Sequence, residues 1–304
     1  MTNTHKDALF VLIKSLSKSE KRQFKLYVGR LGVNTDAKFL ALFNLLDKMR
    51  TYDEKQILES GIVKKSQLSN LKAHLYKQIL VSLRLNPVNQ NVRVQIREQL
   101  DFATILYQKG LYKQSLKILD KAKNFAIENE EKNVAYEIVE LEKIIETQYI
   151  TRSIPDRADE LSVQAKELSA HNVMTSKLSN LSLQLYGMML KVGYVRSDED
   201  FLSVQNYFDA HLPSYDIDKL GFREKLWLYK AHLWYSFLTQ DFLSSYRYAS
   251  KWVDLFYDNE EMIALNPVFF LKGNHYLLES LFFVKYSSQF KETLTKMEEQ
   301  VNSP

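Results

Sequence analysis

Apolar residues recur at three- and four-residue spacing along almost the whole chain, which is the pattern of helices with one buried face. In the first 90 residues the stretches between apolar runs carry helix-capping residues. Ser17 with Glu20 and Thr51 with Glu54 have the spacing of capping boxes, which mark the first turn of a helix. The pattern predicts helices over residues 4–16, 17–30, 36–50, 51–60 and 66–85, the second and fourth beginning with these capping boxes.

From about residue 92 the helices come in pairs, with a repeat length near 40 residues. Repeats of this length are typical of stacked helical hairpins, in which each hairpin needs its neighbours to cover its apolar face. The expected pairs are 92–109 with 112–129, 131–150 with 155–171, 172–192 with 197–211, 219–239 with 242–259, and 267–284 with 287–301.

The composition favours the same fold class. Only 8 Gly and 5 Pro occur in 304 residues, which is far below the usual share of about 12%. Gly-rich phosphate loops and tight β-hairpins need Gly at fixed positions, so this composition argues against both. Because the chain has no Cys, disulfides, thiolate nucleophiles and Cys-bound metals are excluded. We therefore expect an all-α protein.

Residues 103–122 carry small and aromatic side chains at a characteristic spacing, with Ala103, Tyr107, Gly110, Ser115 and Ala122 among them. This segment resembles a tetratricopeptide repeat, and residues 191–194 and 240–245 keep parts of the same pattern. The resemblance implies a right-handed α-solenoid of irregular, tetratricopeptide-like helical hairpins over residues 91–304, with about five hairpins. A basic helical N-terminal segment over residues 1–90 precedes it.

Residues 9–22 read LFVLIKSLSKSEKR, and this opening resembles the N-terminus of a family of uncharacterised bacterial helical-repeat proteins. That family implies no known activity, so this resemblance bears on architecture alone.

In tetratricopeptide-like arrays the first helix of each pair lines a concave surface that binds a ligand. The positions of this chain that match are Arg97, Thr104, Gln108, Asn180, Lys191, Lys230 and Trp234. Long polar and charged side chains on such a surface would bind carboxylates or phosphates of an extended ligand.

Aromatic residues are concentrated near the C-terminus. Of the 38 Phe, Trp and Tyr residues, 23 lie in residues 201–290, where an even distribution would place about 11. Packing between large helices explains most of them, and we expect Trp234 to be the exception that contacts a ligand. Replacing Lys230 and Trp234 together is then expected to weaken binding with little effect on thermal stability.

The positive charge is local. Residues 1–90 hold 16 Lys and Arg against 7 Asp and Glu, a net charge of +9, whereas residues 91–304 have a net charge of −5. Residues 54–66 and the following helix resemble a helix-turn-helix, so this segment is a candidate nucleic-acid site. The other interpretation is the solvated face of an amphipathic helix. The residues on this face are Lys64, Lys65, Asn70, His74, Lys77 and Arg84.

No catalytic or cofactor motif occurs in the chain. The six His are scattered at least 21 residues apart, so a zinc-type pair on one helix face is absent. The acidic residues around Asp198 are expected to begin a helix, where carboxylates are favourable, and those around Asp216 to cap a turn. We expect no enzymatic activity, no metal and no cofactor.

No apolar run approaches the roughly 20 residues that a membrane-spanning helix needs, and no signal peptide is recognisable. We therefore expect a cytoplasmic protein without a membrane partner. The sequence favours a non-enzymatic scaffold that binds a protein or peptide. The alternative is a regulator whose basic N-terminal helices bind nucleic acid, with the repeats as a sensor or partner-binding module.

Overall fold

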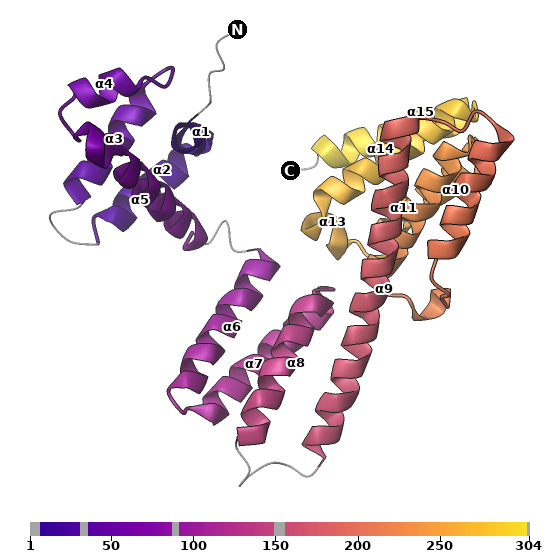
Figure 1. Cartoon of the computed structure of the whole chain (residues 1–304), viewed down its shortest axis with the longest axis horizontal. Coiled ribbons are helices and arrows are strands. Elements are labelled where there is room, and N and C mark those ends of the chain that lie inside the picture. The colour runs from indigo at the N-terminus through magenta and orange to yellow at the C-terminus, as the bar shows by residue number, and fades with distance from the viewer. Residues whose placement is uncertain (1–6, 31–35, 87–90, 149–155, 303–304) are drawn as a thin grey trace. The chain divides into compact units, whose positions relative to one another are not determined.

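The computed structural model describes residues 7–30, 36–86, 91–148 and 156–302 (Figure 1). All regular elements in these ranges are helices, as the spacing of apolar residues predicts. The chain divides into two compact units, residues 1–94 and residues 95–304. None of the helices in the described ranges is both long and apolar enough to span a bilayer.

The described part of the first unit is a small helical bundle. Its helices are α1 (Ala8–Ser15), α2 (Lys18–Val28), α3 (Asp36–Lys48), α4 (Glu54–Glu59) and α5 (Lys65–Arg84). Helices α1, α2 and α3 pack on the long helix α5. Phe24 of α2 and Phe43 of α3 meet at the centre with ring centroids 4.7 Å apart, and both are fully buried.

One of the two predicted capping boxes is confirmed. The Ser17 hydroxyl accepts a hydrogen bond from the Glu20 amide, and the Glu20 carboxylate accepts one from the Ser17 amide. The other prediction is wrong, because α4 is capped by Asp53 rather than by Thr51. Asp53 stands directly before the helix, where its carboxylate accepts from the amides of Lys55 and Gln56 and satisfies two free donors of the first turn.

The second unit begins within α6 and ends near the C-terminus. Its helices are α6 (Val92–Gln108), α7 (Tyr112–Glu128), α8 (Lys132–Gln148), α9 (Arg157–Val192), α10 (Asp198–His211), η2 (Ile217–Lys219), α11 (Phe222–Leu238), α12 (Phe242–Tyr257), α13 (Glu261–Leu265), α14 (Pro267–Phe283) and α15 (Ser287–Asn302). Sequential neighbours pack closely, as in α7 with α8, α11 with α12 and α14 with α15. The predicted boundary at Pro155 lies outside the described residues.

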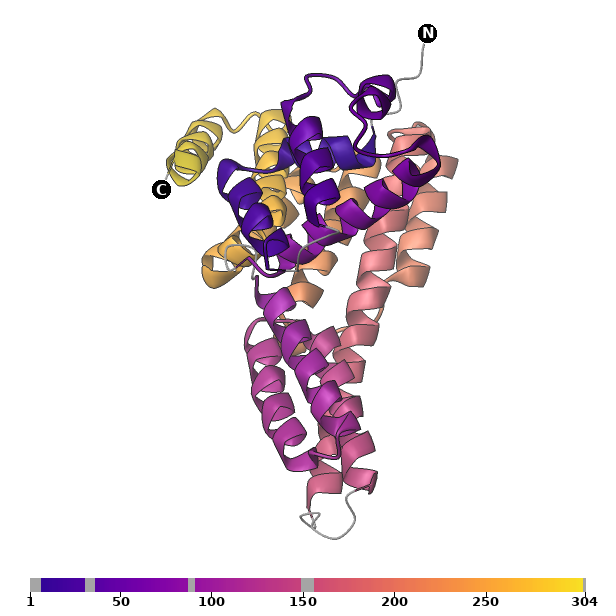
Figure 2. The same ribbon diagram turned by 90° about the vertical axis from the view of Figure 1, so that its left-hand side faces the viewer.

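Helix α9 is continuous over 36 residues, so the prediction of two helices meeting at residue 171 is wrong. The buried residues of its two halves are Leu161, Ala165 and Leu168, then Leu178, Leu181 and Leu185. At about 100° per residue these two sets lie on faces roughly a third of a turn apart. The first half of α9 packs on α8 and the second half packs on α11 (Figures 1 and 2). The apolar pattern therefore shifts because the neighbouring helix changes, and the helix itself is not interrupted.

Small residues bring α6 and α7 close together at the segment that resembles a tetratricopeptide repeat. Ala103 and Ser115 are both fully buried, and the Ser115 hydroxyl donates to the Ala103 carbonyl over 2.7 Å. This hydrogen bond requires the backbones of α6 and α7 to lie close together, because the serine side chain is short. Larger residues at positions 103 and 115 would keep the two helices apart.

A buried carboxylate joins α7, α8 and α9. Glu142 of α8 is fully buried, and its two oxygens lie 2.7 Å from Lys123 Nζ of α7 and 3.1 Å from Arg157 Nη2 of α9. Burial raises the pKa of the Glu142 carboxyl, and the hydrogen bond from Lys123 opposes that rise. Lys123 is itself only 3% exposed, so its charge depends mainly on Glu142, with Asp120 as a second carboxylate at 3.9 Å.

A second polar cluster ties the start of α11 to two distant parts of the unit. Arg223 donates to the Glu130 carbonyl and to the Glu131 carboxylate, each over 2.7 Å, which fixes α11 against the turn between α7 and α8. The buried carboxylate of Glu224 contacts Nδ1 of His171 on α9 at 2.5 Å. These contacts span more than 50 residues of sequence.

The largest hydrophobic core in the described part of the second unit lies mainly among α9, α11, α12 and α14, and seven of its nineteen buried residues are aromatic. His232 belongs to this region and stacks on Tyr248 with ring centroids 4.3 Å apart, while Phe208 meets it edge-on. Burial, together with the charge of Lys251, lowers the pKa of His232 to about 4. The ring is therefore neutral in the folded protein at neutral pH.

The first prediction concerns the buried ion pair. Replacing Glu142 by Ala leaves the buried Lys123 ammonium with only the more distant carboxylate of Asp120, 3.9 Å away, and this costs about 3–5 kcal/mol of the free energy of unfolding. Urea denaturation followed by circular dichroism measures this change. Glu140→Ala removes an exposed ion pair from the same helix and should cost less than about 1 kcal/mol. Equal losses in the two variants would contradict a structural role for Glu142.

The second prediction concerns His232. Its pKa is about 4 when folded and about 6.5 when unfolded, so the unfolded chain binds the proton more tightly. The contribution of the neutral His232 ring to the free energy of unfolding is fully present above about pH 6.5. It decreases as the pH falls toward 4, and about 2 kcal/mol of it is lost at pH 5. Urea denaturation of wild type and His232→Phe at pH 8 and pH 5 measures the part of the pH-dependent loss that is due to His232, because the variant lacks this titrating group. Parallel losses in both proteins would refute it.

Candidate functional site

A pocket of about 400 Å³ opens among α9, α11, α12 and α14 of the second unit. Helices α9, α11 and α14 each belong to a different helical pair of the expected array. The lining residues are Ser179, Asn180, Ser182, Leu183, Tyr186, Trp227, Lys230, Trp234, Trp252, Lys272 and Tyr276. This volume lies in the usual range for pockets that take small ligands or single side chains.

All three tryptophans of the chain line this pocket. Trp252 of α12 is fully buried, and its indole Nε1 has no hydrogen-bond partner among the described residues. Gly273 of α14 allows α14 to approach this ring, since a Cβ atom at position 273 would lie 2.9 Å from Nε1. Trp227 is half-buried and meets Phe269 edge-on.

Trp234 serves both the pocket and the core. Its ring centroid lies 4.7 Å from that of Tyr186 on α9 and 5.2 Å from that of Tyr276 on α14, and only 9% of the residue is exposed. Substitution of Trp234 therefore removes core packing as well as a pocket wall. The expectation that Trp234 is the exception to core packing is therefore wrong, and we now expect its substitution to lower stability as well.

Lys230 places an ammonium group among aromatic rings. Its Nζ lies 4.1 Å from the ring centroid of Trp227, 5.0 Å from that of Phe269 and 5.5 Å from that of Trp252. Within the described ranges no carboxylate forms an ion pair with Lys230, and no Asp or Glu lines the pocket. Burial and the charge of Lys272 lower the pKa of Lys230 to about 8.

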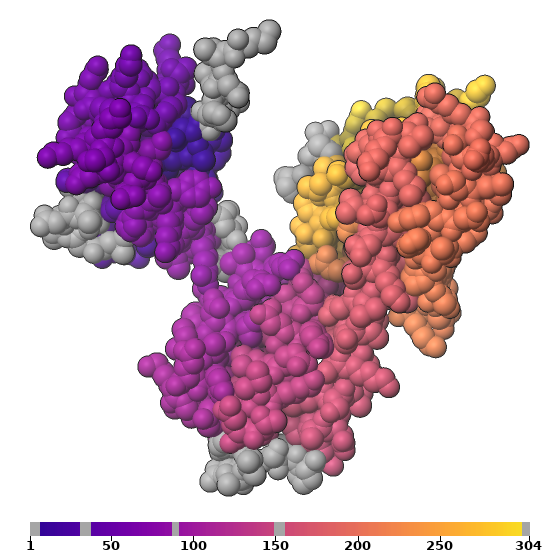
Figure 3. All heavy atoms as spheres, viewed as in Figure 1, coloured from indigo at the N-terminus to yellow at the C-terminus, as the bar shows by residue number. Residues whose placement is uncertain are grey.

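The rim of the pocket is mixed in character. Lys272 on α14 is exposed and adds a second cation, while Ser179 and Asn180 on α9 add neutral polar groups. Further along α9, exposed apolar side chains follow at helical spacing, with Leu183 and Tyr186 at the pocket and Leu190 beyond it. One side of α9 remains at the molecular surface (Figure 3). The site thus combines positive charge, aromatic walls and an adjacent apolar strip.

The structure brings together three of the seven residues that the tetratricopeptide resemblance singled out. Asn180, Lys230 and Trp234 all line the pocket. Lys191 is exposed at the end of α9 and does not line the pocket.

The other three candidates lie apart on α6. Arg97 forms a solvent-exposed ion pair with Glu137 at 3.8 Å, and the Thr104 hydroxyl donates to the Leu100 carbonyl of its own helix. Gln108 is exposed at the C-terminal end of α6. These residues make no part of the pocket.

Sequence reasoning missed Lys272, Trp227, Trp252 and Tyr276 as members of this site. The excess of aromatic residues between 201 and 290 was the one signal that pointed to the region. Which of these rings meet depends on how α12 and α14 pack against α11, and helical periodicity carries no information on that pairing.

The basic candidate face lies in the first unit. The six residues Lys64, Lys65, Asn70, His74, Lys77 and Arg84 are all exposed, on α5 or directly before it. Gly61 in the preceding turn has φ +72°, a conformation that favours glycine, and it separates α4 from α5 as in a helix-turn-helix. His74 also stacks on Phe39 of α3 with ring centroids 4.6 Å apart.

Within the ranges that the structure covers, no group of three or more His, Asp or Glu is placed to hold a metal ion. Comparisons with protein-family models, curated proteins and solved structures give no match to this chain.

Proposed function

We propose that the second unit is a non-enzymatic scaffold, built as a right-handed tetratricopeptide-like array, which binds a peptide segment of a partner protein. The observation that carries this proposal is the pocket with two lysines and no acidic residue, walled by all three tryptophans. The close approach of α6 and α7 through Ala103 and Ser115 supports the architecture.

The chemistry of the pocket favours an acidic ligand group. A side-chain carboxylate or a C-terminal carboxylate entering the pocket would supply the counter-charge that Lys230 and Lys272 lack there. Aromatic walls favour an adjacent aromatic or aliphatic side chain, because such rings contribute strongly to interfaces. The exposed strip of Leu183, Tyr186 and Leu190 on α9 would receive further apolar residues of the same segment.

A peptide display selection against the intact protein tests this function. We expect enriched peptides to carry Asp, Glu or a free C-terminus beside an aromatic or aliphatic residue. Lys230→Met combined with Lys272→Met should weaken their binding by about tenfold or more, which corresponds to about 1.4 kcal/mol. Fluorescence anisotropy of a labelled peptide measures the affinity.

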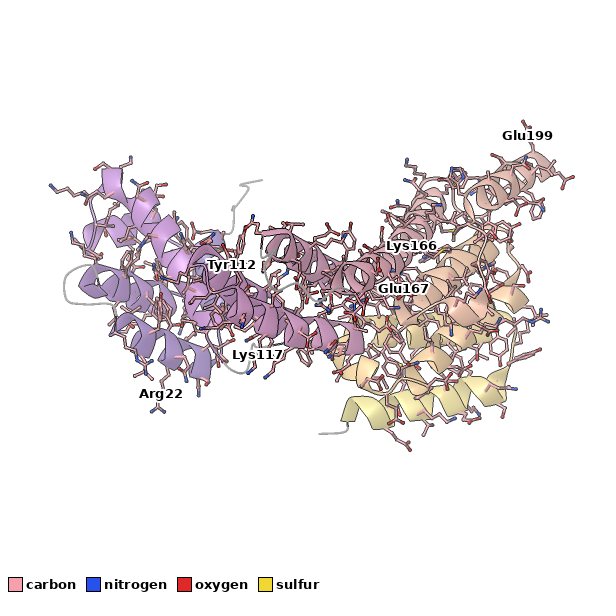
Figure 4. The ribbon with its side chains drawn as sticks, turned by 90° about the horizontal axis from the view of Figure 1, so that it is seen from below. Arg22, Tyr112, Lys117, Lys166, Glu167 and Glu199 are labelled. Atoms are coloured by element: carbon pink, nitrogen blue, oxygen red, sulfur yellow. The ribbon has the colours of Figure 1, made fainter. Side chains whose placement is uncertain are left out.

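The matched control is Lys117→Met combined with Lys166→Met, which removes the same charge from exposed positions outside the pocket (Figure 4). This variant should bind like wild type. Enrichment without acidic groups, or equal weakening in both double variants, would overturn the proposal.

A second candidate function rests on the first unit. Helix α5 has 20 residues, four of them Lys or Arg and none of them Asp or Glu. Helix α2 adds Lys18, Lys21, Arg22 and Lys25, and its one carboxylate, Glu20, is engaged in the capping box. Figure 4 labels Arg22 on this helix. Helices with so few carboxylates suit a polyanion, and nucleic acid is the polyanion that a helix-turn-helix binds.

For this candidate, a labelled 20-base-pair duplex is titrated with full-length protein at several salt concentrations. Replacing Lys64, Lys65 and Lys77 together by Ala should weaken binding. It should also reduce the slope of log K against log salt by about one for each phosphate that the variant no longer neutralises. The control Lys117→Met with Lys166→Met should leave the slope unchanged. Absence of binding by wild type at low salt would eliminate this function.

A further inference from the structure

Lys230 differs from an ordinary lysine in three physical respects. Its amine faces a pocket that a small molecule can enter, it has no ion-pair partner among the described residues, and aromatic rings of three helices surround it. A structural lysine in a protein interior is normally paired with a carboxylate, as Lys123 is with Glu142 in this same unit. Lys230 therefore lacks the carboxylate partner that a structural lysine such as Lys123 has.

The surroundings of Lys230 favour its neutral amine. Burial is the larger cause and the positive charge of Lys272 the second, and together they lower the pKa to about 8. About a fifth of such amines are neutral at pH 7.4, against about one in a thousand for a lysine with an ordinary pKa. Only the neutral amine has the free lone pair that a nucleophile needs.

No other group on the surrounding helices restores the charged form by pairing with it. The titratable residues that share the pocket are Lys272 and Tyr276 of α14 and Tyr186 of α9, and α12 contributes Trp252 alone. The rings attract the ammonium ion, but they accept no proton and carry no full charge, so their attraction is weaker than that of a carboxylate.

We propose that Lys230 is a nucleophilic amine that captures an aromatic α-keto acid as a reversible imine. This inference goes beyond the proposed function, because it concerns a small molecule and requires no protein partner. The Nζ lone pair attacks the keto carbon while the C=O π electrons move to oxygen, which takes up a proton. The resulting carbinolamine loses its hydroxyl group as water, and Nζ gives up its remaining proton as the C=N bond forms. The sum is amine plus ketone giving imine plus water, with no oxidant or reductant.

The rest of the pocket selects this class of carbonyl compound. Lys272 is a second cation at the same pocket and would pair with the carboxylate of the keto acid. Trp227 and Trp234 offer aromatic surface to an aryl side chain, and a volume of about 400 Å³ accommodates a molecule of this size. A lysine next to another cation in an apolar pocket is a known means of activating an amine toward carbonyl groups.

Reductive trapping tests the proposal on the full-length chain. Phenylpyruvate is the probe, and cyanoborohydride converts any imine into a stable secondary amine that peptide mapping by mass spectrometry assigns to a residue. We expect Lys230 to be modified at pH 7.4 at least about tenfold faster than Lys166, an exposed lysine of α9 with no such surroundings (Figure 4). Peptide mapping also separates any adduct at the α-amino group.

Two variants keep the test decisive. Lys272→Met removes the neighbouring charge but leaves Lys230 in place, and it should slow modification of Lys230 and shift its pH profile to higher pH. Lys166→Met, the matched surface control, should change neither. Modification of Lys230 no faster than that of Lys166 in the wild type, or an unchanged Lys230 pH profile in Lys272→Met, would overturn the proposal. Failure of peptide selection would leave this result unaffected, because the trapping needs no peptide.

Discussion

The uninterrupted helix α9 is the element on which the second unit depends. Its first half packs on α8 and receives the Arg157 contact to Glu142, while its second half packs on α11 and lines the pocket. At 1.5 Å per residue its 36 residues extend over about 54 Å. Because one rigid helix holds both halves, the α7–α8 hairpin and the aromatic core keep a fixed relation without a large interface of their own.

The charged residues of this unit show how one physical effect has opposite results in different settings. Burial removes water from Glu142 and from Lys230 alike, and in each case it favours the neutral form. Around Glu142, two cations oppose that tendency and the carboxylate joins three helices. Around Lys230, a second lysine reinforces it. The first arrangement stabilises the fold and the second leaves an amine available for chemistry.

Much of the fold could be predicted from the sequence, because helices follow from local patterns. Apolar spacing located the helices, and the Ser17–Glu20 box fixed one boundary correctly. The boundary at residue 171 failed because a change in the buried face resembles a break when neighbours are unknown. For the site, an excess of aromatic residues indicated the right region. The meeting of Lys230 with Lys272 and Trp252 was not predictable, since it depends on which helices pack together.

The close contact between Gly273 and the Trp252 indole links two positions that are 21 residues apart in sequence. A methyl group at position 273 would press on the ring, and the helix could accept it only if α14 moved outward or the residue at 252 became smaller. Either adjustment changes the floor of the pocket. In the evolution of this fold, substitutions at 252 and 273 should therefore arise together, and a lineage that loses this glycine should also reshape the pocket.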